Sequence, residues 1–263
     1  MQLADKDSSP MLAEPPDRLI LEGTWSLFLD VDGTLIDIAP SPEAVVVPPG
    51  LPDILVRISA ALDGALALVS GRPVAQLDRL FAPVIFPAAG EHGAELRRAA
   101  GEPIVAATPP AALALLRRRL AAAVDAVAGA RLEIKRTALV VHYRQAVGAA
   151  TRLRRLVDEA VAAHAADLEV QPGKMVIEIK HAGSSKGRAV TAFMRRAPFA
   201  KRRPLFIGDD AADRDAFAAA RAAGGCGAAV GSDHADAADW AFASPAAVRA
   251  WLTRVAGRHP SQS

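Results

Sequence analysis

Short apolar runs that end abruptly in polar residues recur along this chain. Three of them stop at an aspartate, a serine or a glycine followed by aspartates, and they occupy residues 27–29, 65–69 and 204–207. Runs of this length, apolar on both faces, are typical of strands inside a parallel sheet that is covered by helices. Ligands bind beyond the carboxyl ends of the strands in such sheets. The pattern therefore predicts one functional edge built from residues that are far apart in the sequence.

Helical patterns alternate with these runs in two stretches of the chain. The elements expected between and after the three runs are helices over about 51–62, from Pro73, over 185–196, after Asp210 and from Pro245, and strands over 84–88 and 228–230. A proline suits the first position of a helix because its missing N–H would have no partner there. Alternating strands and helices predict parallel strands joined by right-handed crossovers.

The rhythm changes between about Pro103 and Lys180, where the order becomes helix, strand, strand, helix, strand, strand. A long Ala/Leu/Arg helix is expected over 110–127, followed by strands over 131–135 and 138–142. This order predicts a separate small α+β unit with an antiparallel sheet. The expected fold class is therefore α/β, a Rossmann-like parallel-sheet core domain with an inserted α+β cap domain.

The predicted domains follow from these two rhythms. The core is expected to combine residues 21–102 and 182–263, and the cap to occupy residues 103–181. Residues 1–20 contain two adjacent prolines, several charges and little periodicity, so they are expected to form a flexible leader. A cleft between two domains is a natural place to enclose a small molecule.

Composition narrows the class of protein further. The chain has 263 residues, of which 51% are hydrophobic and 23% charged, as in ordinary soluble globular proteins. Its single cysteine, Cys226, suits a reducing cytoplasm, and no signal peptide or membrane-spanning run is visible. The net charge of +2 is too small to indicate nucleic-acid binding. We expect a cytoplasmic protein that acts on a small molecule, with no nucleic acid, no membrane and no obligate protein partner.

The predicted strand ends and one helix start bring polar side chains together. They are Asp30 and Asp32, Ser70 and Arg72, Asp209, Asp210 and Asp213, and Lys186. Several carboxylates at one point repel one another unless a cation lies between them, and hard oxygen ligands suit Mg²⁺. A lysine near a helix N-terminus opposes the helix dipole, so its position favours a bound anion. Such a site suits phosphoryl transfer, in which one carboxylate can attack phosphorus and another can carry the proton.

Four motifs in this order, on this strand rhythm, resemble the haloacid dehalogenase-like phosphatases across nearly the whole chain. They are Asp-Val-Asp-Gly-Thr-Leu at 30–35, Ser70, Lys186 and Gly-Asp-Asp-x-x-Asp at 208–213. The resemblance implies that Asp30 is the nucleophile and Asp32 the general acid/base. It implies that Ser70 and Lys186 hold the phosphoryl oxygens. The implied Mg²⁺ ligands are Asp30, the backbone carbonyl of Asp32 and Asp209, with Asp210 and Asp213 as accessory acids.

The inserted unit narrows the resemblance to the trehalose-6-phosphate phosphatases, whose cap grips the sugar. The similar stretches are 70–72, 91–93, 141–144 and 173–178. A disaccharide presents many hydroxyls, from which a glutamate can accept and to which basic side chains can donate. The implied substrate-binding residues are Asp30, Asp32, Arg72, Glu91, His92, Lys135, His142, Arg144, Lys174 and Glu178. The implied reaction is Mg²⁺-dependent hydrolysis of trehalose 6-phosphate to trehalose and phosphate through an aspartyl-phosphate.

Two departures from the family pattern leave alternatives open. Ala212-Asp213-Arg214 stands where the family usually has Thr-Asp-Glu, and Lys180-His181 stands where it usually has Arg-Pro. Because Arg214 replaces an acid near the predicted metal site, a non-catalytic module that binds a sugar phosphate is one alternative. Another is a phosphatase of the same superfamily for a different sugar phosphate, such as sucrose phosphate or a mannosyl compound.

Overall fold

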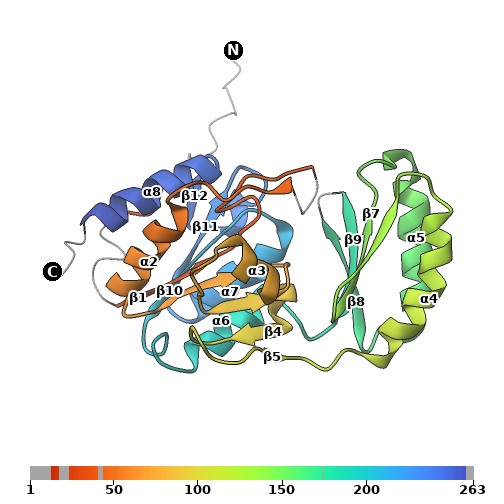
Figure 1. Ribbon diagram of the computed structural model, residues 1–263, viewed down its shortest axis with the longest axis horizontal. Helices are drawn as coiled ribbons and strands as arrows, with labels where there is room; N and C mark the ends of the chain where they lie inside the picture. The colour runs from red at the N-terminus through yellow and green to blue at the C-terminus, as the bar shows by residue number, and fades with distance from the viewer. Residues whose placement is uncertain (1–12, 18–23, 41–43, 174, 259–263) are drawn as a thin grey trace, which may run out of the picture.

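Two separate sheets, each with helices packed against it, form the two parts of the protein in the described residues (Figure 1). The computed structural model describes residues 13–17, 24–40, 44–173 and 175–258. Each sheet has its own cluster of buried hydrophobic side chains. The two parts are called the core and the cap below.

The core sheet has eight strands in the part of the chain that the structure describes, in the order β12-β11-β10-β1-β2-β3-β4-β5. These strands are β1 (Trp25–Leu29), β2 (Leu66–Val69), β3 (Ala88–Gly90), β4 (Glu95–Arg97), β5 (Val105–Ala106), β10 (Arg203–Gly208), β11 (Cys226–Val230) and β12 (Trp240–Phe242). Neighbours from β12 to β3 pair in parallel, which was predicted for the strands from β11 to β3. The associated helices are α2 (Leu51–Ala61), α3 (Val74–Leu80), α6 (Lys186–Met194), α7 (Arg214–Ala222) and α8 (Pro245–Arg258). The predicted α/β class is therefore confirmed.

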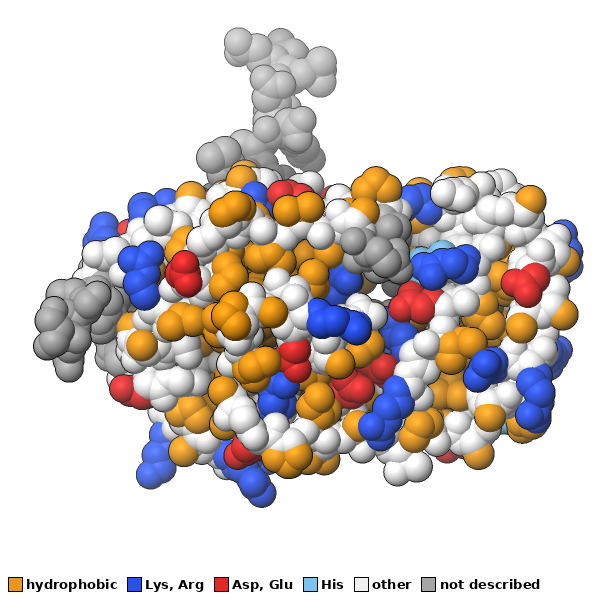
Figure 2. All heavy atoms as spheres, viewed as in Figure 1, with side chains coloured by type: hydrophobic (Ala, Val, Ile, Leu, Met, Phe, Trp, Pro, Cys, Tyr) orange, Lys and Arg blue, Asp and Glu red, His pale blue; other side chains and the backbone are white. Residues whose placement is uncertain are grey.

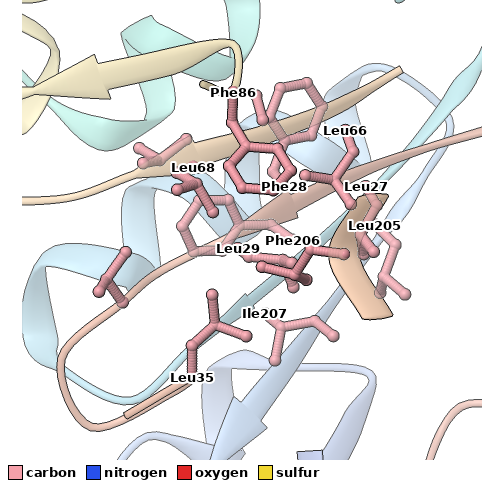
Figure 3. Packing of buried hydrophobic residues seen from close by; sticks show 14 of the residues in the cluster. Leu27, Phe28, Leu29, Leu35, Leu66, Leu68, Phe86, Leu205, Phe206 and Ile207 are labelled. Atoms are coloured by element: carbon pink, nitrogen blue, oxygen red, sulfur yellow. The ribbon is translucent and has the colours of Figure 1, made fainter. Parts of the chain in front are cut away.

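The strands β1 and β2 are buried along their whole length, and β10 is buried from Pro204 onward, which explains why these sequences lack polar alternation. All five residues of β1 are buried. Figure 3 shows side chains of β1, β2 and β10 lying together, among them Leu29, Leu68 and Ile207. Apolar contact on both faces of β1 holds its C-terminal end, and with it Asp30, in a fixed place.

Three core strands were not predicted, and one was predicted too early. The expected strand over 84–88 is β3, which begins only at Ala88, because Pro87 before it has no N–H to give to the ladder. The missed strands are β4, β5 and β12, of which β4 and β5 extend the sheet antiparallel to β3. β5 lies beyond residue 102, where the core segment was expected to end. Strands of two or three residues are too short to carry a hydrophobic period.

The cap sheet has four antiparallel strands among the described residues, in the order β6-β7-β9-β8. The cap elements are α4 (Ala111–Asp125), β6 (Arg131–Ile134), β7 (Ala138–His142), α5 (Ala150–Val161), β8 (Leu168–Gly173) and β9 (Val176–His181). The helices α4 and α5 cover one face of this sheet (Figure 1). Its chain order matches the predicted insertion between the two segments of the core. None of the described helices combines the length and apolar character that crossing a membrane requires.

Part of the predicted flexible leader packs against α8. Trp251 donates its indole N–H to the carbonyl of Pro15 over 2.8 Å, and Arg254 pairs with Glu14 at 2.7 Å. Asp17 pairs with Arg258 at 3.1 Å. For residues 13–17 the prediction of a loose segment was therefore wrong, because these contacts join them to the last helix. The rest of the segment 1–20 lies outside the described residues.

Candidate active site

A cavity of about 540 Å³ lies between the carboxyl edge of the core sheet and the cap sheet. Its lining includes Asp30 and Lys186 from the core and Glu178 from the cap. Figure 2 shows charged side chains of both signs gathered where the two parts of the molecule meet. The volume falls within the range of small-molecule sites, so the cavity can enclose a substrate the size of a sugar phosphate.

A buried cluster of three acids adjoins the cavity, which is lined by one of them, Asp30. Asp30 follows β1, Asp209 follows β10 and Asp213 ends a short helical turn, and one carboxylate oxygen from each lies within 4.8 Å of the others. The turn after Asp32 brings Gly33 so close that a Cβ there would lie 2.2 Å from Asp209 Oδ2. Burial raises the pKa of Asp30 well above its ordinary value, and burial raises the pKa of Asp213 to about 7. Carboxylates crowded in this way suit a hard divalent cation.

Lys186 partly balances the charge of this cluster. It is the first residue of α6 and only 3% exposed, and its Nζ lies 2.7 Å from Asp30 Oδ1 and 2.7 Å from Asp213 Oδ1. Burial alone would lower the pKa of Lys186, but the Asp213 and Asp30 carboxylates outweigh burial and raise it. One ammonium cannot neutralise three carboxylates, so the residues present fit an additional cation.

Asp32 and Ser70, the other two predicted catalytic residues, are linked through Arg72. The Arg72 guanidinium donates two bonds of 2.7 Å to the Asp32 carboxylate, and its backbone N–H donates to Ser70 Oγ over 3.1 Å. Bidentate pairs of this kind fix orientation as well as charge. Thr34, which sequence reasoning did not single out, donates from its hydroxyl to Asp30 Oδ2 over 3.4 Å. Arg72, expected at the substrate, thus holds the carboxylate expected to carry the proton.

The two predicted accessory acids occupy different places. Asp213 belongs to the buried cluster, whereas Asp210 lines the cavity and lies 3.9 Å from Lys186 Nζ. They form a capping box, in which Asp210 Oδ1 accepts from the N–H of Ala212 and Asp213 Oδ2 accepts from the N–H of Asp210. The short helical turn after β10 therefore places Asp213 in the buried acid cluster and Asp210 in the lining of the cavity.

Arg214, the residue that departs from the family pattern, points to the surface. Its guanidinium pairs with Asp236 through bonds of 2.9 and 3.0 Å, and both side chains are largely exposed. Because the pair is solvated, we expect Arg214→Ala to change the affinity of the acid cluster for a divalent cation by less than about twofold. Calorimetric titration of the protein with a divalent cation checks this, and tenfold weaker binding would place Arg214 in the metal site.

On the cap side, Glu178 of β9 joins the two parts across the cavity. Its carboxylate lies 2.7 Å from His92 Nε2 of the core and 2.9 Å from Lys135 Nζ of the cap. Lys135 also donates to the carbonyl of Gly71 in the core over 2.9 Å. Burial would raise the pKa of Glu178, but His92 and Lys135 outweigh it and lower the pKa. Glu178 is thus an ionised acceptor between two donors.

The remaining predicted sugar-binding residues are only partly brought together. His142 and Arg144 line the cavity, and His142 Nε2 lies 2.6 Å from Glu133, a lining residue that sequence reasoning missed. Alternation along 131–135 puts Glu133 on the same face as Lys135 and could have indicated it. Lys174 lies outside the described residues. Glu91 does not line the cavity, and its carboxylate accepts instead from the backbone N–H groups of 136 and 137.

Acids at the ends of β1 and β10, a buried lysine from α6 and a polar cap sheet above them lie together, as the resemblance to the haloacid dehalogenase-like phosphatases led us to expect. A solved structure, that of the C. albicans trehalose-6-phosphate phosphatase C-terminal domain, superposes with a TM-score of 0.81 over 95% of this chain and 99% of that chain. At 22% sequence identity this likeness establishes the fold.

Sequence comparison identifies the family within that class. The trehalose-phosphatase family model matches residues 28–246, so the chain belongs to the trehalose-phosphatase family. The trehalose-6-phosphate phosphatase of Escherichia coli is 39% identical over 244 residues, which cover 93% of this chain and 90% of that protein. A "probable trehalose-phosphate phosphatase" of Sinorhizobium fredii is 44% identical over 207 residues, covering 79% and 78%.

Proposed function

We propose that this protein hydrolyses trehalose 6-phosphate to trehalose and phosphate, with Mg²⁺ as cofactor and Asp30 as the phosphoryl acceptor. The observation that carries the proposal is the contact of Asp30 with Lys186 at the floor of a cavity whose roof is the polar face of the cap sheet. The names of the two relatives and the matched family support the choice of substrate.

The proposed reaction has two steps on Asp30. A carboxylate oxygen of Asp30 attacks phosphorus, the bond from phosphorus to the sugar oxygen breaks, and Asp32 gives a proton to that leaving oxygen. Asp32 then takes a proton from a water molecule, which attacks phosphorus, releases phosphate and restores the Asp30 carboxylate. Asp32 must enter the first step protonated on one oxygen, and the bond from Arg72 to its other oxygen then orients the carboxyl group for both transfers.

The phosphoryl group needs positive charge and donors around it in this proposal. Lys186 and the Ser70 hydroxyl bind its oxygens. Asp30, Asp209 and Asp213, with the backbone carbonyl of Asp32, would hold Mg²⁺, which when bound would neutralise charge on the phosphoryl oxygens. Three buried oxygen donors of one kind favour a hard cation over a soft one, which supports magnesium.

The cap is proposed to select the sugar through Glu178. We expect Glu178→Gln to lower kcat/KM for trehalose 6-phosphate about 10- to 100-fold, because unpaired buried groups cost about 1–3 kcal/mol each. Hydrolysis of p-nitrophenyl phosphate, which does not reach the cap, should change by less than about threefold. Steady-state kinetics with both substrates measure the difference.

A matched control for Glu178→Gln lies on the outer side of the cap. Glu159 on α5 is exposed, and its carboxylate forms an ion pair with Arg155 at 3.6 Å. Glu159→Gln should leave both substrates unaffected. Equal losses on both substrates in Glu178→Gln would argue against sugar recognition by this residue.

A panel of phosphosugars tests the substrate. Phosphate release from trehalose 6-phosphate should exceed release from sucrose 6-phosphate, glucose 6-phosphate and mannosyl phosphates, should stop with a chelator and should return with Mg²⁺. A different preferred sugar would support another phosphatase of the superfamily. Calorimetric binding of trehalose 6-phosphate without phosphate release in Mg²⁺ would support a binding module.

The proposed location of the protein is the cytoplasm, a reducing compartment. Cys226, the single cysteine of the sequence, is buried and in the thiol form. Burial raises its pKa to about 11, which suppresses the reactive thiolate. The fold therefore draws no stability from a disulfide, as expected of a protein kept among reduced thiols.

A further inference from the structure

The turn between β6 and β7 of the cap rests on a buried carboxylate of the core. Glu91 accepts from the N–H of Arg136 over 3.0 Å, from the N–H of Thr137 over 2.7 Å and from the hydroxyl of Thr137. Glu91 is 2% exposed and Thr137 is 1% exposed. All these donors belong to the cap turn between β6 and β7, so the Glu91 side chain of the core fixes the position of this turn.

Left-handed backbone aims Glu91 at this turn. Glu91, His92 and Gly93 have φ values of 46°, 54° and 92°, although two of them carry side chains that disfavour this region. The N–H of Glu91 donates to the carbonyl of Arg72 over 3.0 Å, and that of His92 to Ser70 over 3.0 Å. The strained turn is therefore tied to the loop that carries Ser70 and Arg72.

The turn bound by Glu91 lies where the chain passes between the core and the cap. Arg136 donates from Nη2 to the carbonyl of Ala107, at the passage into the cap, over 3.3 Å. Lys180, paired in register with Ala138 next to the turn, donates to the carbonyl of Ser184, at the passage back, over 2.8 Å. The turn 135–137, with Ala107 and Ser184 where the chain enters and leaves the cap, is called the pivot of the cap below. Glu91 contacts this pivot through the N–H groups of Arg136 and Thr137.

We propose that Glu91 is a positioning residue that anchors the pivot of the cap and so sets the place of Lys135 and Glu178 over the catalytic edge. Lys135 directly precedes the gripped residues and contacts both Glu178 and the core carbonyl of Gly71. Glu91 itself acts without touching the substrate. This inference rests on the proposed function, because its effect is selectivity for a substrate that reaches the cap.

The test replaces Glu91 by glutamine, which keeps the shape but turns an N–H₂ group toward N–H donors. In Glu91→Gln, kcat/KM for trehalose 6-phosphate should fall at least about tenfold, mainly through KM, while p-nitrophenyl phosphate should change by less than about threefold. Amide hydrogen exchange at Arg136 and Thr137 should become faster. Thr137→Val, which removes one donor and keeps two, should shift selectivity in the same direction by a smaller factor.

Glu95 provides a matched control within the same core segment. It is 8% exposed and accepts from the N–H of Val74 over 2.8 Å, a contact confined to the core. Glu95→Gln should leave the ratio of the two substrates unchanged. Equal losses on both substrates in Glu91→Gln, or unchanged exchange at the turn, would overturn the inference. If the wild-type protein released no phosphate from trehalose 6-phosphate, the proposed function would fail, and hydrogen exchange would still decide whether Glu91 holds the pivot.

Discussion

Replacing Asp30 by asparagine should abolish phosphate release, with a fall in kcat on the order of 10⁴-fold or more, as expected when a nucleophile is removed. An amide cannot attack phosphorus, and asparagine otherwise keeps the shape of the side chain. The folded protein should persist, because burial raises the pKa of Asp30 and a neutral group is therefore tolerated there. Phosphate release and thermal unfolding measure the two effects.

Asp37→Asn is the matched control for this variant. Asp37 lies in the same loop, pairs with Arg249 at 3.2 Å and has a side chain that is 70% exposed. It should retain full activity. Full activity in Asp30→Asn itself would end the proposal that this carboxylate accepts the phosphoryl group.

Replacing Lys186 by methionine should lower both activity and stability. Activity should fall on the order of 10³-fold, because the phosphoryl oxygens lose their buried cation. Stability should fall by about 3–5 kcal/mol, since Asp30 and Asp213 lose a partner that lies 2.7 Å from each. Kinetics and denaturant unfolding measure these losses.

The stability loss in Lys186→Met should depend on pH. The pKa of Asp213 is about 7 with Lys186 present, after burial has raised it, and removing the lysine raises it further. A carboxyl whose pKa is raised on folding takes up a proton, so its contribution to stability is lost as the pH rises through the folded pKa. The variant should therefore be less destabilised at about pH 6 than at about pH 8. An equal loss at both pH values would show that the Lys186 charge is not balanced by Asp213 and Asp30.

The convergence of the candidate site residues at one edge of the sheet could be predicted because they stand at the ends of buried apolar runs. Asp30, Ser70 and Asp209 follow runs with no polar interruption, and a parallel sheet brings such ends together whatever their separation in sequence. The cap was predictable as a separate unit because the order of its helices and strands departs from strict alternation. The short strands β4, β5 and β12 were not, since two or three residues carry no period.

The direction of individual side chains could not be read from the sequence. Glu91 was expected at the sugar, but left-handed φ values at two non-glycine residues turn its carboxylate to the cap turn, and no residue type there signals that conformation. Arg214 was expected beside the metal, yet it pairs with Asp236, a partner 22 positions away. Asp210 and Asp213 share one motif, and the helical turn between them places Asp210 in the cavity lining and Asp213 in the buried acid cluster.

Asp30 is proposed to carry the phosphoryl group during hydrolysis of trehalose 6-phosphate. The most direct measurement is rapid acid quenching of the wild-type protein during turnover with Mg²⁺, followed by mass spectrometry of the peptide that contains Asp30. We expect a peptide heavier by one phosphoryl group, seen only with substrate and absent from Asp30→Asn. Steady phosphate release with no phosphoryl group on this peptide would contradict it.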